Sequence, residues 1–416
     1  MPQHNRARSL SCRLPAPPLM AALLAIVTAC EQSPPTAPPS PGNDAAPQIN
    51  TEVLDFAAEL GGPLPDLTPH QQDLFARGLG VFQTAFTPAT GLGPLFNNAA
   101  CSDCHEAPVV GGSGEEVETH QSAFHGGACD DLSAIGGPVI QDSVTPALQA
   151  LGIDKEPLLP EATGTAHRTT PNVLGFDLLE AVPAAEILAL ADPLDLDGDG
   201  ISGRPNRTAD GRLGRFGRKA QVATLREFTA GAFLNEMGIT SPDQLTDQTI
   251  RDEPLPEGAD PTPEPELTQE DLIATTRFMQ LSAPPPPLPR GLVEVQGFFT
   301  FVRIGCASCH VPTLVTGPSR VAALNFQVVH AYTDLLLHKM GPDLADICLG
   351  RARPGEFRTE PLMGLRFKET FLHDGRAASI EEAVQAHAGE ATGARDRFMG
   401  LSASERDAIL KFLSGL

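Results

Sequence analysis

The feature that most constrains this chain is a short cysteine motif that occurs twice, about 200 residues apart. The two copies are Cys101-Ser-Asp-Cys104-His105 and Cys306-Ala-Ser-Cys309-His310. Two thiols one helical turn apart can each bond a vinyl group of the same haem, and the histidine that follows can turn its imidazole onto the iron. The motif therefore predicts two covalently bound c-type haems, with the two motif histidines as iron ligands.

The first 30 residues have the composition of an export signal. Three arginines precede an apolar stretch over residues 19–27, which is too short to span a bilayer as a helix. The stretch ends in Val27-Thr28-Ala29-Cys30, which resembles a bacterial lipobox. We therefore expect residues 1–29 to be a lipoprotein signal peptide and Cys30 to carry a lipid that anchors the protein to a bacterial membrane in the periplasm. An ordinary cleaved signal is the alternative.

Zinc is the alternative interpretation of the two motifs, because Cys-x-x-Cys pairs with histidine are also zinc ligands. Haem is favoured because each copy carries its own histidine, and because export brings the chain to the compartment where haem is attached. Two further cysteines, Cys129 and Cys348, could pair there as a disulfide that joins the two halves of the chain. The sequence leaves this pairing open, because it does not give the distance between them.

Charge and aromatic content exclude some functions. The chain has 29 lysines and arginines against 52 aspartates and glutamates, which gives a formal net charge of −23. A protein that binds nucleic acid needs a basic surface to meet phosphates, so nucleic acid is not an expected partner, whereas a basic soluble protein is compatible with this charge. The chain has no tryptophan, so electrons cannot pass through an indole.

The two motifs divide the chain into modules. Residues 30–66 are rich in proline and are predicted to be an extended tether. Residues 67–283 are predicted to be an N-terminal haem c domain and residues 290–416 a C-terminal one, joined by a proline-rich strap.

Apolar residues at helical spacing occur in both modules. One example is the stripe before the second motif, formed by Leu292, Val295, Phe299 and Val302. No alternating strand pattern is evident, and residues 110–165 are expected to be mainly loop. The expected fold class is therefore mostly α, with two cytochrome c-like haem domains and long ordered loops.

The ligand opposite each motif histidine decides the function of that haem. Two strong ligands make an electron carrier, whereas an open position lets a substrate reach the iron. For the second haem, His387 is the candidate, because Ser379 can cap a helix whose apolar face includes it. A buried core histidine is the alternative. For the first haem, His120 and His125 lie in a polar stretch and could approach, but an available sixth position is expected.

Two further side chains are candidates for roles beside the haems. Glu180 is a lone acid in an apolar run, where burial would raise its pKa and suit proton transfer; an exposed glutamate at a helix end is the alternative. Arg376 follows His373-Asp374-Gly375 and could hold haem propionates, because a guanidinium binds carboxylates bidentately. A simple local turn is the alternative there.

A segment that begins at Asp195 has the pattern of a calcium loop. Acids occupy alternate positions, Asp195, Asp197 and Asp199, and Gly200 is the sixth residue, as in the first half of an EF-hand loop. The glutamate usual at the twelfth position is absent, and Asn206 stands there. A bound Ca²⁺ is expected, with a solvated acidic turn as the alternative.

Several segments together resemble one family. They are the two haem motifs, Arg168-Thr-Thr-Pro-Asn-Val-Leu-Gly175 running into Leu178-Leu179-Glu180-Ala-Val-Pro183, the loop from Asp195 to Arg204, and Phe371-Leu-His-Asp-Gly-Arg-Ala377. They resemble di-haem oxidoreductases of the bacterial di-haem cytochrome c peroxidase and MauG superfamily, over about residues 68–416. The resemblance implies a peroxidatic haem in one domain, an electron-storing haem in the other and calcium near their junction.

The resemblance also bears on His387. In that superfamily the distal ligand of the second haem follows the histidine of the His-Asp-Gly turn by fourteen residues, and here that position is His387. The peroxidases have methionine there, so ligation by His310 and His387 implies a lower potential than histidine and methionine would give. The inter-haem tryptophan of related enzymes is also missing, which leaves haem edge, backbone or phenylalanine as the electron route.

The leading hypothesis is a di-haem oxidoreductase that reduces hydrogen peroxide at the N-terminal haem. Glu180 or a neighbour would move the proton, and the C-terminal haem would supply the second electron, replenished by a small redox protein. Three alternatives stay open. They are MauG-like oxidation of an organic or protein substrate, a tethered electron-transfer cytochrome without catalysis, and a structural haem lipoprotein.

Overall fold

The computed structural model describes residues 59–416 of the chain. The predicted signal peptide, Cys30 and the first part of the predicted tether lie outside the described residues. None of the helices that the structure describes combines the length and the apolar character needed to cross a bilayer.

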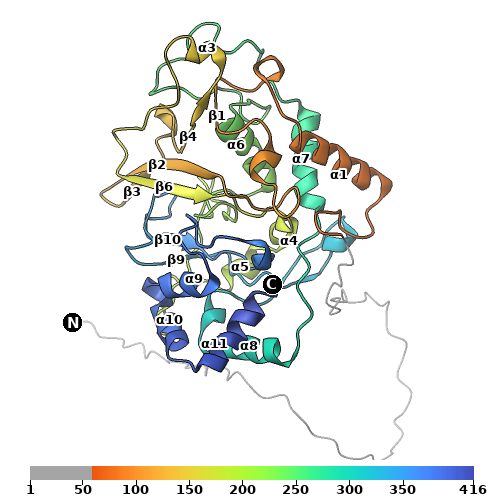
Figure 1. The fold of residues 1–416 in the computed structure, drawn as a ribbon, viewed down its shortest axis with the longest axis vertical. Coiled ribbons are helices and arrows are strands. Elements are labelled where there is room, and N and C mark those ends of the chain that lie inside the picture. The colour runs from red at the N-terminus through yellow and green to blue at the C-terminus, as the bar shows by residue number, and fades with distance from the viewer. Residues whose placement is uncertain (1–58) are drawn as a thin grey trace, which may run out of the picture. The chain divides into compact units, whose positions relative to one another are not determined.

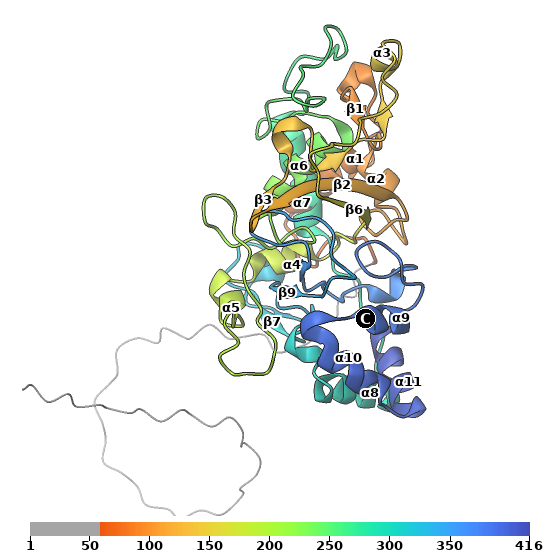
Figure 2. The same ribbon diagram turned by 90° about the vertical axis from the view of Figure 1, so that its left-hand side faces the viewer.

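The described residues form α-helices and short strands joined by long connections. The helices are α1 (Pro69–Phe82), α2 (Cys101–Cys104), α3 (Pro146–Gln149), α4 (Phe176–Ala181), α5 (Ala184–Leu188), α6 (Leu225–Met237), α7 (Gln269–Leu281), α8 (Leu292–Arg303), α9 (Ile380–Ala386), α10 (Thr392–Met399) and α11 (Ala403–Leu413). The strands are β1 (Leu95–Phe96), β2 (Val117–His125), β3 (Ala128–Asp130), β4 (Val139–Ile140), β5 (Ser143–Val144), β6 (Gly164–Thr169), β7 (Leu314–Val315), β8 (Val328–Val329), β9 (Leu337–Lys339) and β10 (Glu356–Arg358). Figures 1 and 2 show α1, α6 and α7 in the upper half, α8 to α11 in the lower half, and β2, β6 and β9 between them.

The expected mostly α class is wrong, because the described chain mixes helices with four small sheets. The largest sheet is antiparallel, and its strand β2 pairs with β3, β4 and β6. Strand β2 was not predicted, because its polar and apolar residues do not alternate; in the structure four consecutive residues, His120 to Ala123, are buried. Its partner β6 lies about 40 residues further along the chain, so the pairing is long-range. Residues 110–165, expected to be mainly loop, contain four strands of the fold and helix α3.

The same helix crossing occurs in both halves of the chain. Gly78 of α1 packs on α7 so closely that a Cβ atom there would lie 1.9 Å from the carbonyl oxygen of Ala274. Gly297 of α8 packs on α11 in the same way, and its Cβ would lie 2.0 Å from the carbonyl oxygen of Ala408. Only glycine allows the two backbones to approach so closely.

Each crossing places a phenylalanine next to a motif histidine. Phe82 of α1 has its ring centre 5.8 Å from that of His105, and Phe301 of α8 has its ring centre 6.4 Å from that of His310. In each half these phenylalanines also contact a phenylalanine of the second helix, Phe278 or Phe412. The two motifs are therefore positioned by one packing arrangement used twice.

The apolar stripe predicted on α8 faces solvent. Leu292 is 90% exposed and Phe299 is 65% exposed, and Val295 and Val302 are also exposed. The crossing at Gly297 turns the opposite face of the helix, with Thr300 and Phe301, into the core. Periodicity therefore identified the helix correctly but not the face that it buries.

The two predicted haem domains share one apolar core. Its buried members include Leu179 and Phe216 from the first range and Leu324 and Leu335 from the second. The domain boundaries themselves stay a prediction.

A disulfide joins the two ranges as well. It links Cys129 of β3 to Cys348, across a sequence separation of 219 residues, and so answers the question that the sequence left open. A cross-link that closes so long a loop destabilises the unfolded chain by roughly 5 kcal/mol in the chain-entropy view.

Candidate functional site

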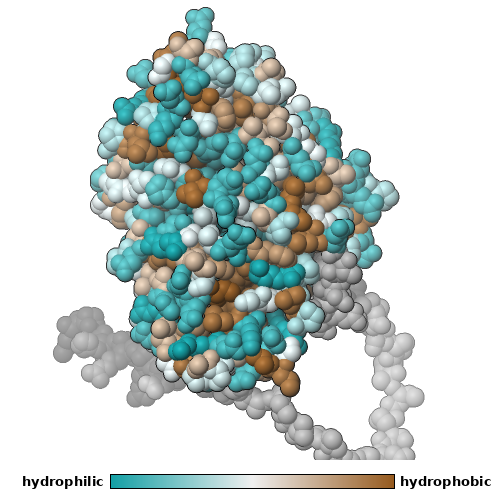
Figure 3. Space-filling view, viewed as in Figure 1, coloured by the Kyte–Doolittle hydropathy of each residue, from teal (hydrophilic) through white to brown (hydrophobic). Residues whose placement is uncertain are grey.

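A cavity of about 490 Å³ lies beside the second motif, and Cys306, Cys309, His310 and His387 all border it. Apolar side chains form much of the remaining wall, among them Phe301, Leu365, Ile380, Val384, Phe398 and Ile409. Apolar residues also gather on the surface of the lower half in Figure 3, over the region of α9 to α11. Two thiols, two imidazoles and an apolar wall suit a haem.

His310 and His387 face each other across this cavity. Their ring centres are 6.5 Å apart. A metal bound between the two rings would lie about 2 Å from one nitrogen of each imidazole. Adding the distance from each nitrogen to its ring centre accounts for the observed spacing. The Nδ1 atom of His310 lies 3.0 Å from the carbonyl oxygen of Tyr332, and that of His387 lies 2.7 Å from the carbonyl oxygen of Ala383. Each Nδ1–H can donate to its carbonyl, which leaves Nε2 of both rings free for a metal.

Local structure explains how His387 reaches this position. Ser379 caps α9 by accepting a hydrogen bond from the backbone N–H of Glu382, as the sequence predicts, and His387 directly follows the last residue of that helix. Burial lowers the pKa of His387 and lowers that of His310 to about 4. Both imidazoles are therefore neutral near pH 7, which is the form that binds iron.

His338 also borders the cavity but is not available as a ligand. Its Nε2 lies 2.8 Å from Asp334 and its Nδ1 lies 3.0 Å from Glu390, so carboxylates engage both ring nitrogens. Burial opposes a charge on this ring, but hydrogen bonds to Asp334, Cys309 and Glu390 raise the pKa of His338 to about 12. His338 is an imidazolium, which cannot coordinate a metal.

The first motif lies on α2, with His105 directly after it. Nδ1 of His105 lies 3.1 Å from the carbonyl oxygen of Gly112, and the backbone of Pro171 also lies near this ring. Burial lowers the pKa of this histidine, so the ring is neutral and can bind a metal through Nε2. Asn98 donates a hydrogen bond to the sulfur of Cys104, and the sulfur of Met237 lies 4.0 Å from that of Cys101. The donor set of two free thiols and one neutral imidazole fits a second haem.

The structure brings no second imidazole ring against His105 among the described residues; the ring next to it is that of Phe82. His120, one of the two histidines considered for this position, lies in β2, where its Nε2 is 3.0 Å from the carboxylate of Glu118. The other, His125, is exposed at the end of β2.

Glu180 lies on α4 and serves as an acceptor at a helix start. One of its oxygens accepts a hydrogen bond from the backbone N–H of Leu225, the first residue of α6, at 2.7 Å. The other accepts from the side-chain amide of Gln280. Both oxygens are therefore occupied, and neither contact involves the first motif.

Two acids that the sequence did not single out lie near the first motif. Glu236 accepts a hydrogen bond from Asn97, and Glu118 contacts His120. Burial and the nearby Glu118 raise the pKa of Glu236 well above its usual range. Burial acts against ionisation of Glu118 too, but the hydrogen bond with His120 and the nearby Arg168 lower its pKa. Two neighbouring acids with pKa values shifted apart are typical of a proton donor and its partner.

Arg376 does not border the cavity. Its guanidinium pairs with Asp374 and donates a hydrogen bond to the carbonyl oxygen of Asp343, and about half of its side chain is exposed. Other basic residues line the cavity, among them Arg218, Arg358 and Lys368. These three come from separate segments, so no local motif marks them.

The acidic loop differs from the predicted ligand set in one position. Carboxylate oxygens of Asp192, Asp195 and Asp197 all lie within 4.8 Å of one another. Asp199 is not in this group, and one of its oxygens accepts a hydrogen bond from the backbone N–H of Ile201. These three carboxylates offer the oxygen ligands that Ca²⁺ prefers. Asp192 was missed because it precedes the first position of the EF-hand pattern.

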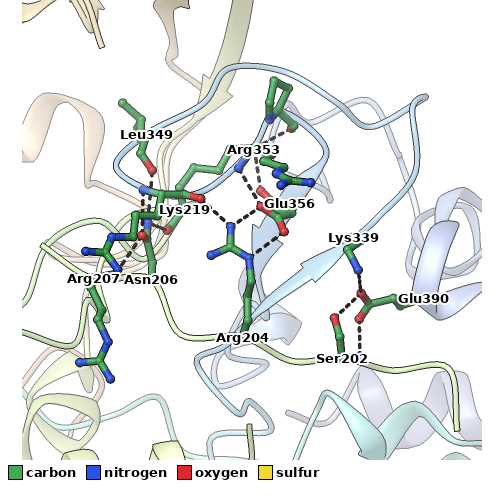
Figure 4. Close-up of polar contacts among 12 residues, drawn as sticks. Ser202, Arg204, Asn206, Arg207, Lys219, Lys339, Leu349, Arg353, Glu356 and Glu390 are labelled. Carbon is green, nitrogen blue, oxygen red and sulfur yellow. Dashed lines mark hydrogen bonds and ion pairs between the residues drawn. The ribbon is translucent and has the colours of Figure 1, made fainter. Parts of the chain in front are cut away.

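Residues 202–206, which follow this loop, form hydrogen bonds and an ion pair with residues of the C-terminal half, as Figure 4 shows. Ser202 donates hydrogen bonds to Glu390, and Arg204 pairs with Glu356. Asn206 at the twelfth position is fully buried and donates to the carbonyl oxygens of Lys219 and Leu349, so it is part of this attachment.

Comparison with known proteins places residues 154–416 in one family, described as "Di-haem oxidoreductase, putative peroxidase". No curated protein sequence matches the chain. Similar solved structures include a hydrazine synthase of Kuenenia stuttgartiensis, with 11% identity and a TM-score of 0.41, over 89% of this chain and 100% of that one. The diheme peroxidase BthA of Burkholderia thailandensis has 16% identity and a TM-score of 0.39, over 87% and 88%. A MauG-like protein associated with microbial copper homeostasis has 15% identity and a TM-score of 0.29, over 58% and 88%.

Proposed function

The chain belongs to the di-haem oxidoreductase family, and we propose that it reduces hydrogen peroxide at the haem of its first motif. Cys101 and Cys104 would attach that haem covalently, with His105 as its iron ligand. Cys306 and Cys309 would attach the second haem.

The observation that carries this proposal is the difference between the two motif histidines. His310 has the ring of His387 opposite it at 6.5 Å, whereas the ring next to His105 is that of Phe82. Two imidazoles saturate an iron and favour electron transfer, while a single imidazole leaves a position for substrate. The haem of the first motif, when bound, would supply the iron chemistry that reduces peroxide.

The side chains around the first motif would hold that haem and provide the proton. Gly112 fixes the tautomer of His105 through its carbonyl oxygen, and Phe82 packs against the imidazole. Glu236, protonated through burial and the nearby Glu118, would donate one of the two protons that the two-electron reduction of peroxide to water consumes; solvent would supply the other. Glu180 is the alternative donor.

Electrons would enter from a small redox protein and pass through the haem bound by His310 and His387. We place this reaction in the periplasm, with the protein held to the membrane by a lipid on Cys30. The proposal is tested by peroxide consumption with a reduced one-electron donor. Steady, donor-dependent turnover is expected, and protein that contains both haems but consumes no peroxide would contradict it.

Substituting each candidate acid separates the two proton donors. Glu236→Gln is expected to lower kcat for peroxide by about 100-fold or more, since a positioned acid contributes roughly that much. Glu180→Gln should leave kcat within about twofold, because an amide oxygen can still accept from the N–H of Leu225. Stopped-flow kinetics on both variants decide the point. A large loss in Glu180→Gln alone would transfer the role to Glu180.

We also propose that Ca²⁺ binds at Asp192, Asp195 and Asp197. Removing calcium with a chelator should lower Tm, because an ion that binds only the folded state stabilises it. Asp195→Asn should abolish this response. A second group of carboxylates, Asp247, Asp260, Glu264 and Glu266, is equally close-set, so Asp260→Asn is the matched control. Loss of the calcium response in the control but not in Asp195→Asn would refute this site.

A further inference from the structure

The wall of the cavity beside the second motif, here called the C-terminal cavity, contains an excess of positive charge. Five lysines and arginines border the cavity against three carboxylates; the cations are Arg218, Arg358, Lys368, Arg395 and Arg397, and the acids are Asp199, Glu360 and Glu390. Three of the cations, Arg218, Arg358 and Lys368, lie around Glu360. Arg218 pairs with one oxygen of Glu360 at 3.0 Å, and Arg358 pairs with the other at 2.8 Å. In the group around Glu360, three cations therefore share one carboxylate.

The remaining donors of this group are directed to the backbone or have no partner. Arg358 also donates to the carbonyl oxygens of Gly217 and Thr359, and Arg218 donates to that of Thr169. No ion pair involves Lys368 among the described residues; burial and the nearby Arg218 lower its pKa to about 8. Glu360 is the opposite charge near this ammonium, but it already pairs with both guanidinium groups, so the group keeps an excess of positive charge.

Such an excess is unusual for this chain. Its net charge is −23, so composition alone would favour carboxylates in any given place. The side chain of Arg358 is only 4% exposed and that of Arg218 only 10%. Buried charge without a counter-ion is energetically costly. An anion with two negative charges would balance the excess charge of this group.

We propose that Arg218, Arg358 and Lys368 bind the two propionate carboxylates of the C-terminal haem. The inference rests on the proposed function, because it takes the cavity beside Cys306 and Cys309 as that haem's site. The haem matches this site in two ways. Its apolar ring system suits the apolar wall, and its two propionate carboxylates neutralise the two excess positive charges. Guanidinium groups bind carboxylates with particular strength.

The position of Lys368 adds a consequence for electron transfer. It also lines a second cavity of about 300 Å³, which is bordered by Glu106 and Ala107, directly after the first motif. Thr169 and Thr170 line that cavity too, and their buried hydroxyls have no hydrogen-bond partner in the described structure. The propionate end of the C-terminal haem would therefore point toward the first motif. In a chain without tryptophan, this end is the route that we propose for the electron between the haems.

The test is the reduction potential of the C-terminal haem, measured by spectroelectrochemical titration of the protein with both haems bound. Lys368→Gln removes a positive charge and should shift the equilibrium toward ferric iron. Glu360→Gln removes a negative charge and should shift it toward ferrous iron. Each substitution is expected to change the ratio of ferric to ferrous haem at a given potential by roughly tenfold. This is the effect of a unit charge about 10 Å away at an effective dielectric constant of about 20. Arg376→Gln is the matched control and should leave the equilibrium unchanged.

The opposite signs separate this account from a structural effect, since mere loosening of the pocket would move both variants the same way. The low-spin spectrum should stay unchanged in all three, because His310 and His387 are untouched. Shifts of equal sign in Lys368→Gln and Glu360→Gln, or a shift in Arg376→Gln alone, would overturn the proposal. The titration requires no peroxide turnover, so it decides this point even if the proposed reaction fails.

Discussion

Replacing His387 by methionine is expected to raise the reduction potential of the C-terminal haem strongly while the haem stays low-spin. A thioether favours ferrous iron, whereas a second imidazole favours ferric iron. Replacing His387 by alanine should instead open the position and convert this haem to a high-spin form. Both changes are read by redox titration and by electron paramagnetic resonance of the ferric protein.

The matched control is His330→Met, because His330 is an exposed histidine of the same half, and its ring contacts Thr313 and the backbone of Pro312. It should leave the potential and the spectrum unchanged. If His387→Ala kept a low-spin C-terminal haem, another side chain would be the ligand. His338 would then have to give up both of its carboxylate partners, Asp334 and Glu390.

Removing the cysteines of either motif should remove one haem and should have different effects on activity. Cys101→Ala with Cys104→Ala is expected to abolish peroxide turnover and to leave only a low-spin, bis-histidine haem. Cys306→Ala with Cys309→Ala should leave a first haem that still binds peroxide, but without the second electron it should not turn over repeatedly. Mass spectrometry of the intact protein counts the attached haems.

The outcome is informative only where the remaining half is folded. The disulfide between Cys129 and Cys348 reports on this, because it forms only when β3 lies beside the C-terminal range. If the variant without the second pair kept full turnover with its disulfide formed, the second haem would not be the electron source that we propose.

The sequence was most informative where function requires a fixed local pattern. The two Cys-x-x-Cys-His motifs and the capped helix before His387 each depend on a few neighbouring residues. The structure places the rings of His310 and His387 6.5 Å apart, and local sequence patterns were enough to name both residues. The helix crossing could also have been predicted from the sequence. In both halves the first helix contains Gly-x-x-x-Phe and the second contains Ala-x-x-x-Phe.

The sequence was least informative where distant segments meet. Strand β2 gains its stability from β6, so neither strand needed an alternating pattern of its own. The exposed stripe of α8 looked like a core face because periodicity cannot tell which neighbour a helix packs against. Arg376 was chosen for its nearness to a motif, whereas Arg218, Arg358 and Lys368 reach the cavity from separate segments. Basic residues that are brought together from separate segments can be identified only once the fold is known.

The central claim is that the two irons differ, with one open to peroxide and the other saturated by two histidines. Electron paramagnetic resonance of the purified ferric protein, before and after stoichiometric peroxide, tests it most directly. We predict one high-spin and one low-spin signal, with the high-spin signal lost when peroxide is added. Two low-spin signals that do not respond to peroxide, even after half-reduction, would contradict the account and identify the protein as an electron carrier.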